Sequence, residues 1–248
     1  QRRGLTKPPP GVTPVLGLEC AGTIVAVGNG VSKFRVGDEV LSLLSGGSYA
    51  EYAVASVQTT MKKPRRLSFA EAASIPEAWL TAFQLVHLVA QVRAGEAVLI
   101  HAAASSVGLA AIQLVREAGA IPIVTVGSHS KLDLCLKLGA VGGAIRHEGP
   151  WLERVRTLVP TAAGSRGFDV ILDCVAGSYA EQNVAALAVD GRWVLYSSLG
   201  GPQLPEALAP TFLKALMLRR IQLLATTLRA RPLEYKAHLT RRFAAEVL

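Results

Sequence analysis

The chain has little cysteine, few aromatic residues and few charges. Its 248 residues include three cysteines, 6% aromatic and 18% charged residues, whereas half are apolar. The low charge and high apolar content exclude an intrinsically disordered chain. Three distant cysteines without a Cys-x-x-Cys pair exclude a disulfide framework and a structural zinc site of several cysteines. Reduced thiols at Cys20, Cys135 and Cys174 favour a cytoplasmic protein.

Long uncharged runs are also scarce. The longest, from Ala97 to Val115, is interrupted by polar residues and turn signals, so it predicts two elements and no membrane span. Arg2 and Arg3 open the chain without an apolar signal core behind them. Because the chain begins at Gln1 and ends within a helical pattern, we expect a fragment that is truncated at both ends.

Positive charge is concentrated near the end of the chain. The net charge is +8, and the segment from Lys214 onward has eight basic against two acidic residues, which leaves +2 for residues 1–213. The net charge taken alone would suggest a nucleic-acid partner, but the body of the chain is near neutral and the excess lies at its end. We therefore expect no nucleic-acid partner.

The first part of the chain has the pattern of a small β domain. Short β-branched runs between glycines predict strands at 22–28, 36–43 and 49–55. Tyr49 and Tyr52, in the last of these runs, could donate a proton, but at this spacing in a strand-rich stretch we expect them to be packing residues. From about Ser68 the pattern becomes helical, with a break at Pro76.

The second part alternates apolar strands with helices, which is typical of a parallel sheet built from βαβ units. Strands are predicted at 98–101, 121–127, 142–146, 168–175 and 192–200, and helices near 106–118, 130–138, 150–159 and 178–188. The tail has a helical segment at 211–220, a strand-like segment at 221–228 and a helix from Pro232.

The first strand–helix junction of this sheet has the spacing of a phosphate-binding loop. Against the dinucleotide fingerprint G-x-G-x-x-G, it has Ala103, Ser105 and Gly108. Small residues here let backbone amides approach a pyrophosphate at the helix N-terminus. Close packing alone would also explain them, but the place of the loop after the first of five strands favours a dinucleotide site.

The end of the next strand bears on which dinucleotide is bound. An NAD site has an acidic residue there, and this chain has Gly127, Ser128 and Lys131 instead, with Arg146 after the neighbouring strand. Serine and basic side chains suit the 2′-phosphate of NADPH; the alternative is that Lys131 and Arg146 are ordinary solvated charges. Cys174 ends a further strand, where ligands commonly bind.

Several longer runs resemble the medium-chain dehydrogenase/reductase superfamily: GLECAGTIVAVG, RVGDEV, YAEY, AASIPEAWLTAFQLV, VLIHAAASSVG and DGRWVLY. Within it, nearly the whole chain is similar to the zinc-free, zeta-crystallin-like quinone oxidoreductases. The resemblance implies the α/β fold class, with a partial GroES-like β domain in 1–78, a Rossmann doubly wound parallel sheet in 79–229, and the start of a C-terminal return segment in 230–248. It also implies that about 45 residues are missing in front and about 80 behind.

The resemblance further implies NADPH as cofactor, a quinone or an α,β-unsaturated carbonyl as substrate, and a homodimer when the chain is full length. It places Thr81 near the nicotinamide. No catalytic residue is assigned, and the fragment itself is expected to be weakly active or inactive. The candidate cofactor-binding residues are Thr81, Ala104, Ser105, Ser106, Val107, Gly108, Gly127, Ser128, Lys131, Arg146, Cys174, Val175, Tyr196 and Ser197.

Two departures from related patterns matter. Zinc-dependent relatives have a histidine where this chain has Leu18 and a cysteine where it has Glu77, so no metal is expected. Thr6 stands where quinone oxidoreductases have a tyrosine near the substrate. The loss of that ring keeps a second interpretation open, in which the chain is a catalytically silent NADPH-binding or structural paralogue.

Overall fold

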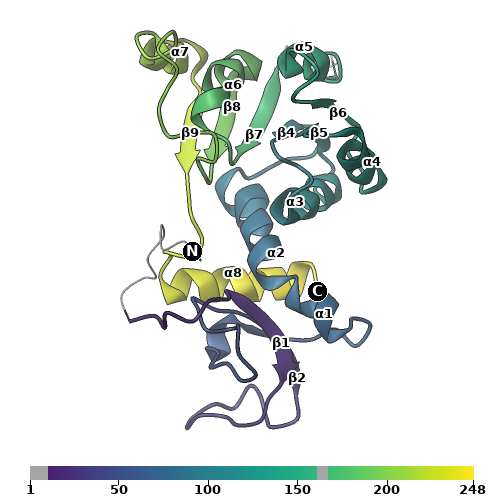
Figure 1. Cartoon of the computed structure of the whole chain (residues 1–248), viewed down its shortest axis with the longest axis vertical. Coiled ribbons are helices and arrows are strands. Elements are labelled where there is room, and N and C mark those ends of the chain that lie inside the picture. Colours follow the sequence, from purple (N-terminus) through teal and green to yellow (C-terminus); the bar gives the residue numbers. More distant parts are fainter. Residues whose placement is uncertain (1–10, 161–166) are drawn as a thin grey trace. The chain divides into compact units, whose positions relative to one another are not determined.

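A computed structural model describes residues 11–160 and 167–248, and these divide into two compact units (Figure 1). Gln1–Thr81 and Leu228–Leu248 make up the first unit, and Ala82–Thr227 make up the second. The domain boundaries expected from the family resemblance lie after residues 78 and 229, with 230–248 as a separate segment. In the structure that last segment forms α8 (Leu233–Glu246), which packs against η1 (Val57–Thr59) and β3 (Thr60–Lys62) of the first unit.

The first unit contains a three-stranded antiparallel sheet. Its strands, in the order β1 (Glu19–Thr23), β2 (Glu39–Leu43) and β3, pair Cys20 with Ser42 and Leu41 with Met61. Leu41 and Met61 are buried, and Phe243 of α8 is buried in the same unit. The apolar side of this small sheet therefore requires a helix from the far end of the chain.

Two predicted strands of this unit differ from the structure. The strand predicted at 22–28 is shifted, because β1 ends at Thr23 and residues 24–28 belong to no strand. The strand predicted at 49–55 is wrong. Residues 49–55 form turns and bends, and the third strand lies at Thr60–Lys62 instead. Tyr49 and Tyr52 are each 75% exposed and Val54 is 96% exposed, so the two tyrosines do not pack in a core. The alternating pattern misled because it records side-chain polarity and does not record whether a neighbouring strand is available for pairing.

A helical segment follows, as predicted, with its break at Pro76. In α1 (Phe69–Ala73), Ser68 and Glu71 form a capping box. Pro76 opens α2 (Pro76–Phe83), where its missing N–H costs no helical hydrogen bond. A π-helical segment, η2 (Gln84–Val89), continues α2.

The second unit is a six-stranded parallel sheet with helices on both faces (Figure 1). Its strands stand in the order β6-β5-β4-β7-β8-β9, the Rossmann doubly wound order, which confirms the predicted fold. The strands are β4 (Ala97–Ile100), β5 (Ile121–Val126), β6 (Gly142–Ile145), β7 (Phe168–Asp173), β8 (Leu187–Leu195) and β9 (Gln222–Ala225). The helical segments are α3 (Ser106–Glu117), α4 (His129–Lys137), α5 (Trp151–Arg156), η3 (Gly177–Tyr179), α6 (Ala180–Ala186) and α7 (Phe212–Arg219).

Burial explains the sequence of the central strands. All four residues of β4 are buried, because helices cover both faces of a parallel sheet. Phe168, Trp193 and Trp151 belong to one large apolar cluster beside the sheet. In the described part of the chain, none of the helices combines the length and the apolar content that crossing a bilayer would need.

Candidate functional site

The first candidate segment is the loop between β4 and α3. Ser105 caps α3, and its Oγ accepts a hydrogen bond from the backbone N–H of Gly108 at 3.2 Å. Ser105 and Ser106 are exposed, so the first turn of the helix is open to solvent. An open helix N-terminus presents unpaired N–H groups and a positive dipole end, which is what a pyrophosphate requires.

Gly108 is required by a close approach between the helix and this loop. A Cβ at this position would lie 2.5 Å from the Cα of Ala103, a backbone atom that cannot swing away. This contact explains why only the last glycine of the fingerprint is retained in this chain. Of the candidate segment Ala104, Ser105, Ser106, Val107 and Gly108, the glycine therefore lies where α3 packs most tightly against this loop.

The second candidate segment lies at the ends of β5 and β6. Ser128 caps α4, and its Oγ accepts from the N–H of Lys131 at 3.4 Å. A Cβ on Gly127 would be 3.9 Å from Nε of Arg146, so the arginine lies close to the end of β5. Arg146 also forms a hydrogen bond with the Tyr179 hydroxyl, whose pKa is raised by burial and partly lowered by that arginine. The structure thus brings Gly127, Ser128 and Arg146 together.

An acidic residue that the sequence reasoning passed over lies at this strand end. Oε1 of Glu148 lies 2.8 Å from Nε2 of His129, and the Glu148 carboxylate forms an ion pair with Arg154 at 3.3 Å. Its negative charge is therefore already matched by neighbours. Lys131 is exposed and Arg146 follows β6, so both remain as cations facing solvent beside the cap of α4.

The third candidate segment, Cys174 and Val175, is held in place by Asp173 at the end of β7. The Asp173 carboxylate is fully buried and accepts hydrogen bonds from the backbone N–H groups of Val175, at 2.6 Å, and Ala176, at 3.1 Å. It also accepts from Asn183 Nδ2 at 2.9 Å and Trp193 Nε1 at 3.0 Å. These donors hold the turn rigidly, including Ala176 with its strained φ of 69°.

His101 connects this turn to the neighbouring strands. Its Nε2 lies 2.7 Å from Asn183 Oδ1, and its Nδ1 lies 2.8 Å from Thr125 Oγ1. Because Asn183 donates its amide N–H to Asp173, its oxygen faces the histidine, so Nε2 carries the proton and Nδ1 accepts from the threonine hydroxyl. Burial lowers the pKa of His101 and keeps the ring neutral. The histidine therefore has a structural role.

The last candidates follow β8 or belong to the other unit. The N–H of Tyr196 donates to the Asp173 carbonyl at 2.9 Å, and burial raises its phenol pKa well above the usual value. Ser197, the next residue, is exposed. Thr81 lies on α2 in the first unit, so its proximity to the cofactor stays a prediction.

The first unit contains a carboxylate pair whose chemistry the sequence reasoning also missed. Oε2 of Glu19, in β1, accepts the backbone N–H of Glu77, in α2, at 2.8 Å. Burial and the Glu19 charge raise the pKa of Glu77 to about 7, against the opposing effects of Lys236 and Arg229. The available signal was two acidic residues, each within an apolar run.

Among described residues, no three His, Cys, Asp or Glu side chains gather as metal ligands would.

The residues of the second unit fit a dinucleotide. Ser105 caps the exposed N-terminus of α3, which offers backbone N–H groups to a phosphate, and the acidic residue typical of NAD sites is absent after β5. Asp173 and Asn183 were missed because sequence reasoning concentrated on loops. The available signal was Asp173, an acidic residue at the end of an otherwise apolar strand. Buried charges are rare unless they have partners, so such a residue indicates a hydrogen-bonded site.

Comparisons with known proteins agree with this geometry. Residues 106–245 match the family model described as zinc-binding dehydrogenase, and residues 1–65 match the alcohol dehydrogenase GroES-like domain. The human quinone oxidoreductase is 35% identical over 186 residues, which span 74% of this chain and 55% of that protein. The chain thus matches little more than half the length of this relative.

Solved structures give the same result. The NADPH complex of Escherichia coli quinone oxidoreductase superposes with a TM-score of 0.79 at 26% identity, covering 96% of this chain and 72% of the other. The CurK enoyl reductase superposes with a TM-score of 0.77 at 32% identity, covering 94% and 66%. From its two matched domains and its sheet order, the chain belongs to the medium-chain dehydrogenase/reductase superfamily, the superfamily of these quinone oxidoreductases.

Proposed function

We propose that this chain is the cofactor-binding part of a zinc-independent oxidoreductase that passes a hydride from NADPH to a quinone or an α,β-unsaturated carbonyl. The observation that carries the proposal is the exposed, serine-capped N-terminus of α3, which Gly108 lets pack closely on the loop after β4, together with the basic residues Lys131 and Arg146 after β5 and β6. The similarity to quinone oxidoreductases and to an enoyl reductase supports both acceptor classes.

Each candidate segment has a distinct task in this proposal. The backbone N–H groups at the start of α3 hold the pyrophosphate, while Ser128, Lys131 and Arg146 bind the 2′-phosphate. The turn after β7, fixed by Asp173, orients the nicotinamide half with Tyr196, Ser197 and Thr81. The hydride is the chemistry that the bound cofactor supplies, and the protein contributes orientation.

The proposal of a zinc-independent reaction rests on side-chain chemistry. Leu18 cannot ligate a metal, and Glu77 stands where zinc-dependent relatives have a cysteine. Its neighbour Glu19 already accepts the Glu77 backbone N–H. Turnover should therefore survive dialysis against a zinc chelator, and loss of turnover that added zinc restores would contradict the proposal.

Replacing Lys131 with alanine tests the choice of cofactor. We expect NADPH binding to weaken at least about tenfold, because a charge-assisted hydrogen bond to phosphate contributes roughly 1.5–3 kcal/mol. NADH binding should stay nearly unchanged. Fluorescence titration of both cofactors measures this, with Lys137→Ala, an exposed lysine at the other end of α4, as the matched control. Equal weakening for both cofactors would mean that Lys131 supports the fold.

The rival function is a silent NADPH-binding or structural paralogue, and two features favour it, Thr6 and the loop at Ser106. Thr6 lies outside the described residues. Titration with NADPH followed by turnover with an ortho-quinone distinguishes the two functions. Binding without turnover in a chain extended to the length of its relatives would support the silent paralogue.

We also propose a homodimer formed by pairing of β9 with its counterpart in a second copy. Among the described strands, β9 pairs only with β8, and Leu223 is 41% exposed on it. An open apolar edge favours pairing with another strand. Leu224→Lys should shift the chain toward monomer in light scattering, and an unchanged mass would argue against this interface.

The free thiols at Cys20, Cys135 and Cys174 support the proposal of a cytoplasmic location.

A further inference from the structure

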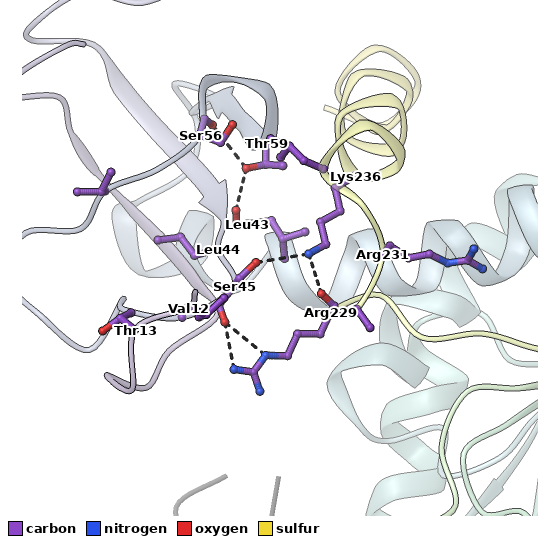
Figure 2. A pocket seen from close by; sticks show the side chains of 14 residues that line it. Val12, Thr13, Leu43, Leu44, Ser45, Ser56, Thr59, Arg229, Arg231 and Lys236 are labelled. Carbon is purple, nitrogen blue, oxygen red and sulfur yellow. Dashed lines mark hydrogen bonds between the residues drawn. The ribbon is translucent and has the colours of Figure 1, made fainter. Parts of the chain in front are cut away.

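The first unit contains a cavity of about 460 Å³ that the proposed cofactor site does not use. It lies between the loop that follows β2, the segment around Val54, and the residues that lead into α8 (Figure 2). This volume is in the range of small-molecule sites. The described lining residues are Val12, Thr13, Leu43, Leu44, Ser45, Gly46, Val54, Ser56, Thr59, Arg229, Ala230, Arg231, Leu233 and Lys236.

Two of the lining cations are anchored at one end of this cavity, and each keeps a free donor. Lys236 is only 8% exposed, and its Nζ donates to Ser45 Oγ at 3.4 Å and to the Arg229 carbonyl at 2.7 Å. Arg229 donates through Nε and Nη2 to the Ser45 carbonyl at 3.3 and 3.1 Å (Figure 2). Its Nη1 is enclosed and has no hydrogen-bond partner in the described chain. Nη1 of the arginine and, by donor count, one N–H of the lysine therefore have no hydrogen-bond partner among the described residues.

The charge around these donors is unbalanced. None of the described lining residues is acidic, although three are basic. Burial lowers the pKa of Lys236, with Arg229 acting in the same direction and Glu77 opposing it. Enclosed cations are costly unless an anion accompanies them. Glu77 is an acidic group that acts on both cations, and a bound anion would compensate the positive charge that remains.

The rest of the lining favours an apolar body. Leu43, Leu44, Val54 and Leu233 are side chains without hydrogen-bonding groups. We propose that this cavity binds a small organic carboxylate, with its two oxygens at Arg229 and Lys236 and its hydrocarbon part along the leucines. Two free donors match the two oxygens of a carboxylate better than the three of a phosphate. The site is independent of the proposed NADPH site.

Calorimetry on the 248-residue chain tests the proposal with hexanoate as the probe, against hexan-1-ol and inorganic phosphate. Hexanoate should bind at least about tenfold more tightly than either, because it alone combines a carboxylate with an apolar body. Comparable binding of hexanol would show that the cavity takes any apolar molecule, and tighter binding of phosphate would show a plain anion site. Either result, or no hexanoate binding, would overturn the proposal.

Two variants with opposite expected effects separate recognition from misfolding. Arg229→Gln keeps an amide that can donate to the Ser45 carbonyl, and it should weaken hexanoate binding at least about tenfold. Its matched control is Arg231→Gln, because the Arg231 guanidinium lies over the Tyr235 ring at 4.5 Å and points away from Ser45 (Figure 2). Equal losses in both variants would contradict the assignment of Arg229.

Glu77→Gln should instead strengthen hexanoate binding. The charged groups that act on Glu77 are Glu19, Lys236 and Arg229, and its ionised form competes with a ligand for the two cations. Hexanoate affinity should therefore fall as the pH rises through about 7 in the unmodified chain, and this dependence should be lost in the variant. A damaged fold cannot produce tighter binding. An unchanged or weaker affinity in Glu77→Gln would overturn the electrostatic basis of the site.

Discussion

Asp173→Asn is expected to lower the free energy of unfolding by at least about 3 kcal/mol, because it removes the charge from a buried acceptor that four N–H donors share. The donors come from Val175, Ala176, Asn183 and Trp193. An asparagine oxygen cannot accept from all four, and its amide group would face other donors. Urea denaturation followed by fluorescence measures the loss.

The control for this variant is Asp133→Asn, which changes an exposed acid on α4 in the same unit. It should leave the free energy of unfolding within about 0.5 kcal/mol of the unmodified chain. A loss below about 1 kcal/mol for Asp173→Asn would show that the turn after β7 does not depend on the carboxylate charge. The variant should also weaken NADPH binding if this turn orients the cofactor.

The second large effect is a pH dependence of stability that comes from Glu77. Its pKa is raised from 4.5 to about 7, chiefly by burial and then by the Glu19 charge. The folded chain therefore keeps the Glu77 proton between pH 4.5 and 7, where the unfolded chain releases it. The stability that this proton contributes is complete below pH 4.5 and is lost as the pH rises through 7.

Glu77→Gln removes this dependence. Relative to the unmodified chain, we expect the variant to gain roughly 3 kcal/mol of unfolding free energy between pH 4 and pH 8. Urea denaturation across that range is the measurement. In Glu19→Gln, the pH range over which stability is lost should move to lower pH. The Glu19 charge, which is the second cause of the raised Glu77 pKa, is absent from that variant. A constant difference between the two chains across the range would refute the assignment.

Local patterns in the sequence predicted much of the second unit. The apolar runs at 98–101 and 121–127 became β4 and β5, and the caps at Ser105 and Ser128 begin the helices that follow. The absence of an acidic residue directly after β5 could also be recognised from the sequence alone. These features depend on residues within a few positions of one another, so one-dimensional reasoning finds them.

Contacts between distant residues were not readable in the same way. The Asp173 turn needs Asn183 and Trp193, and the Glu77 pKa depends on Glu19 and Lys236, from the other end of the chain. Residues 49–55 have the alternation of a strand, yet no described strand pairs with them. Pairing partners and burial are properties of the folded chain.

The sequence by itself determined the fold class and the order of helices and strands in the second unit, and it pointed to the small and basic residues that we propose bind a dinucleotide. Periodicity and capping are local, and they survive without tertiary contacts. Only the tertiary structure decided that α8 completes the first unit and that Arg229 and Lys236 border one cavity. The physical reason is desolvation: burial by residues far apart in the chain changes a side chain's charge and its need for partners, and sequence spacing carries no record of it.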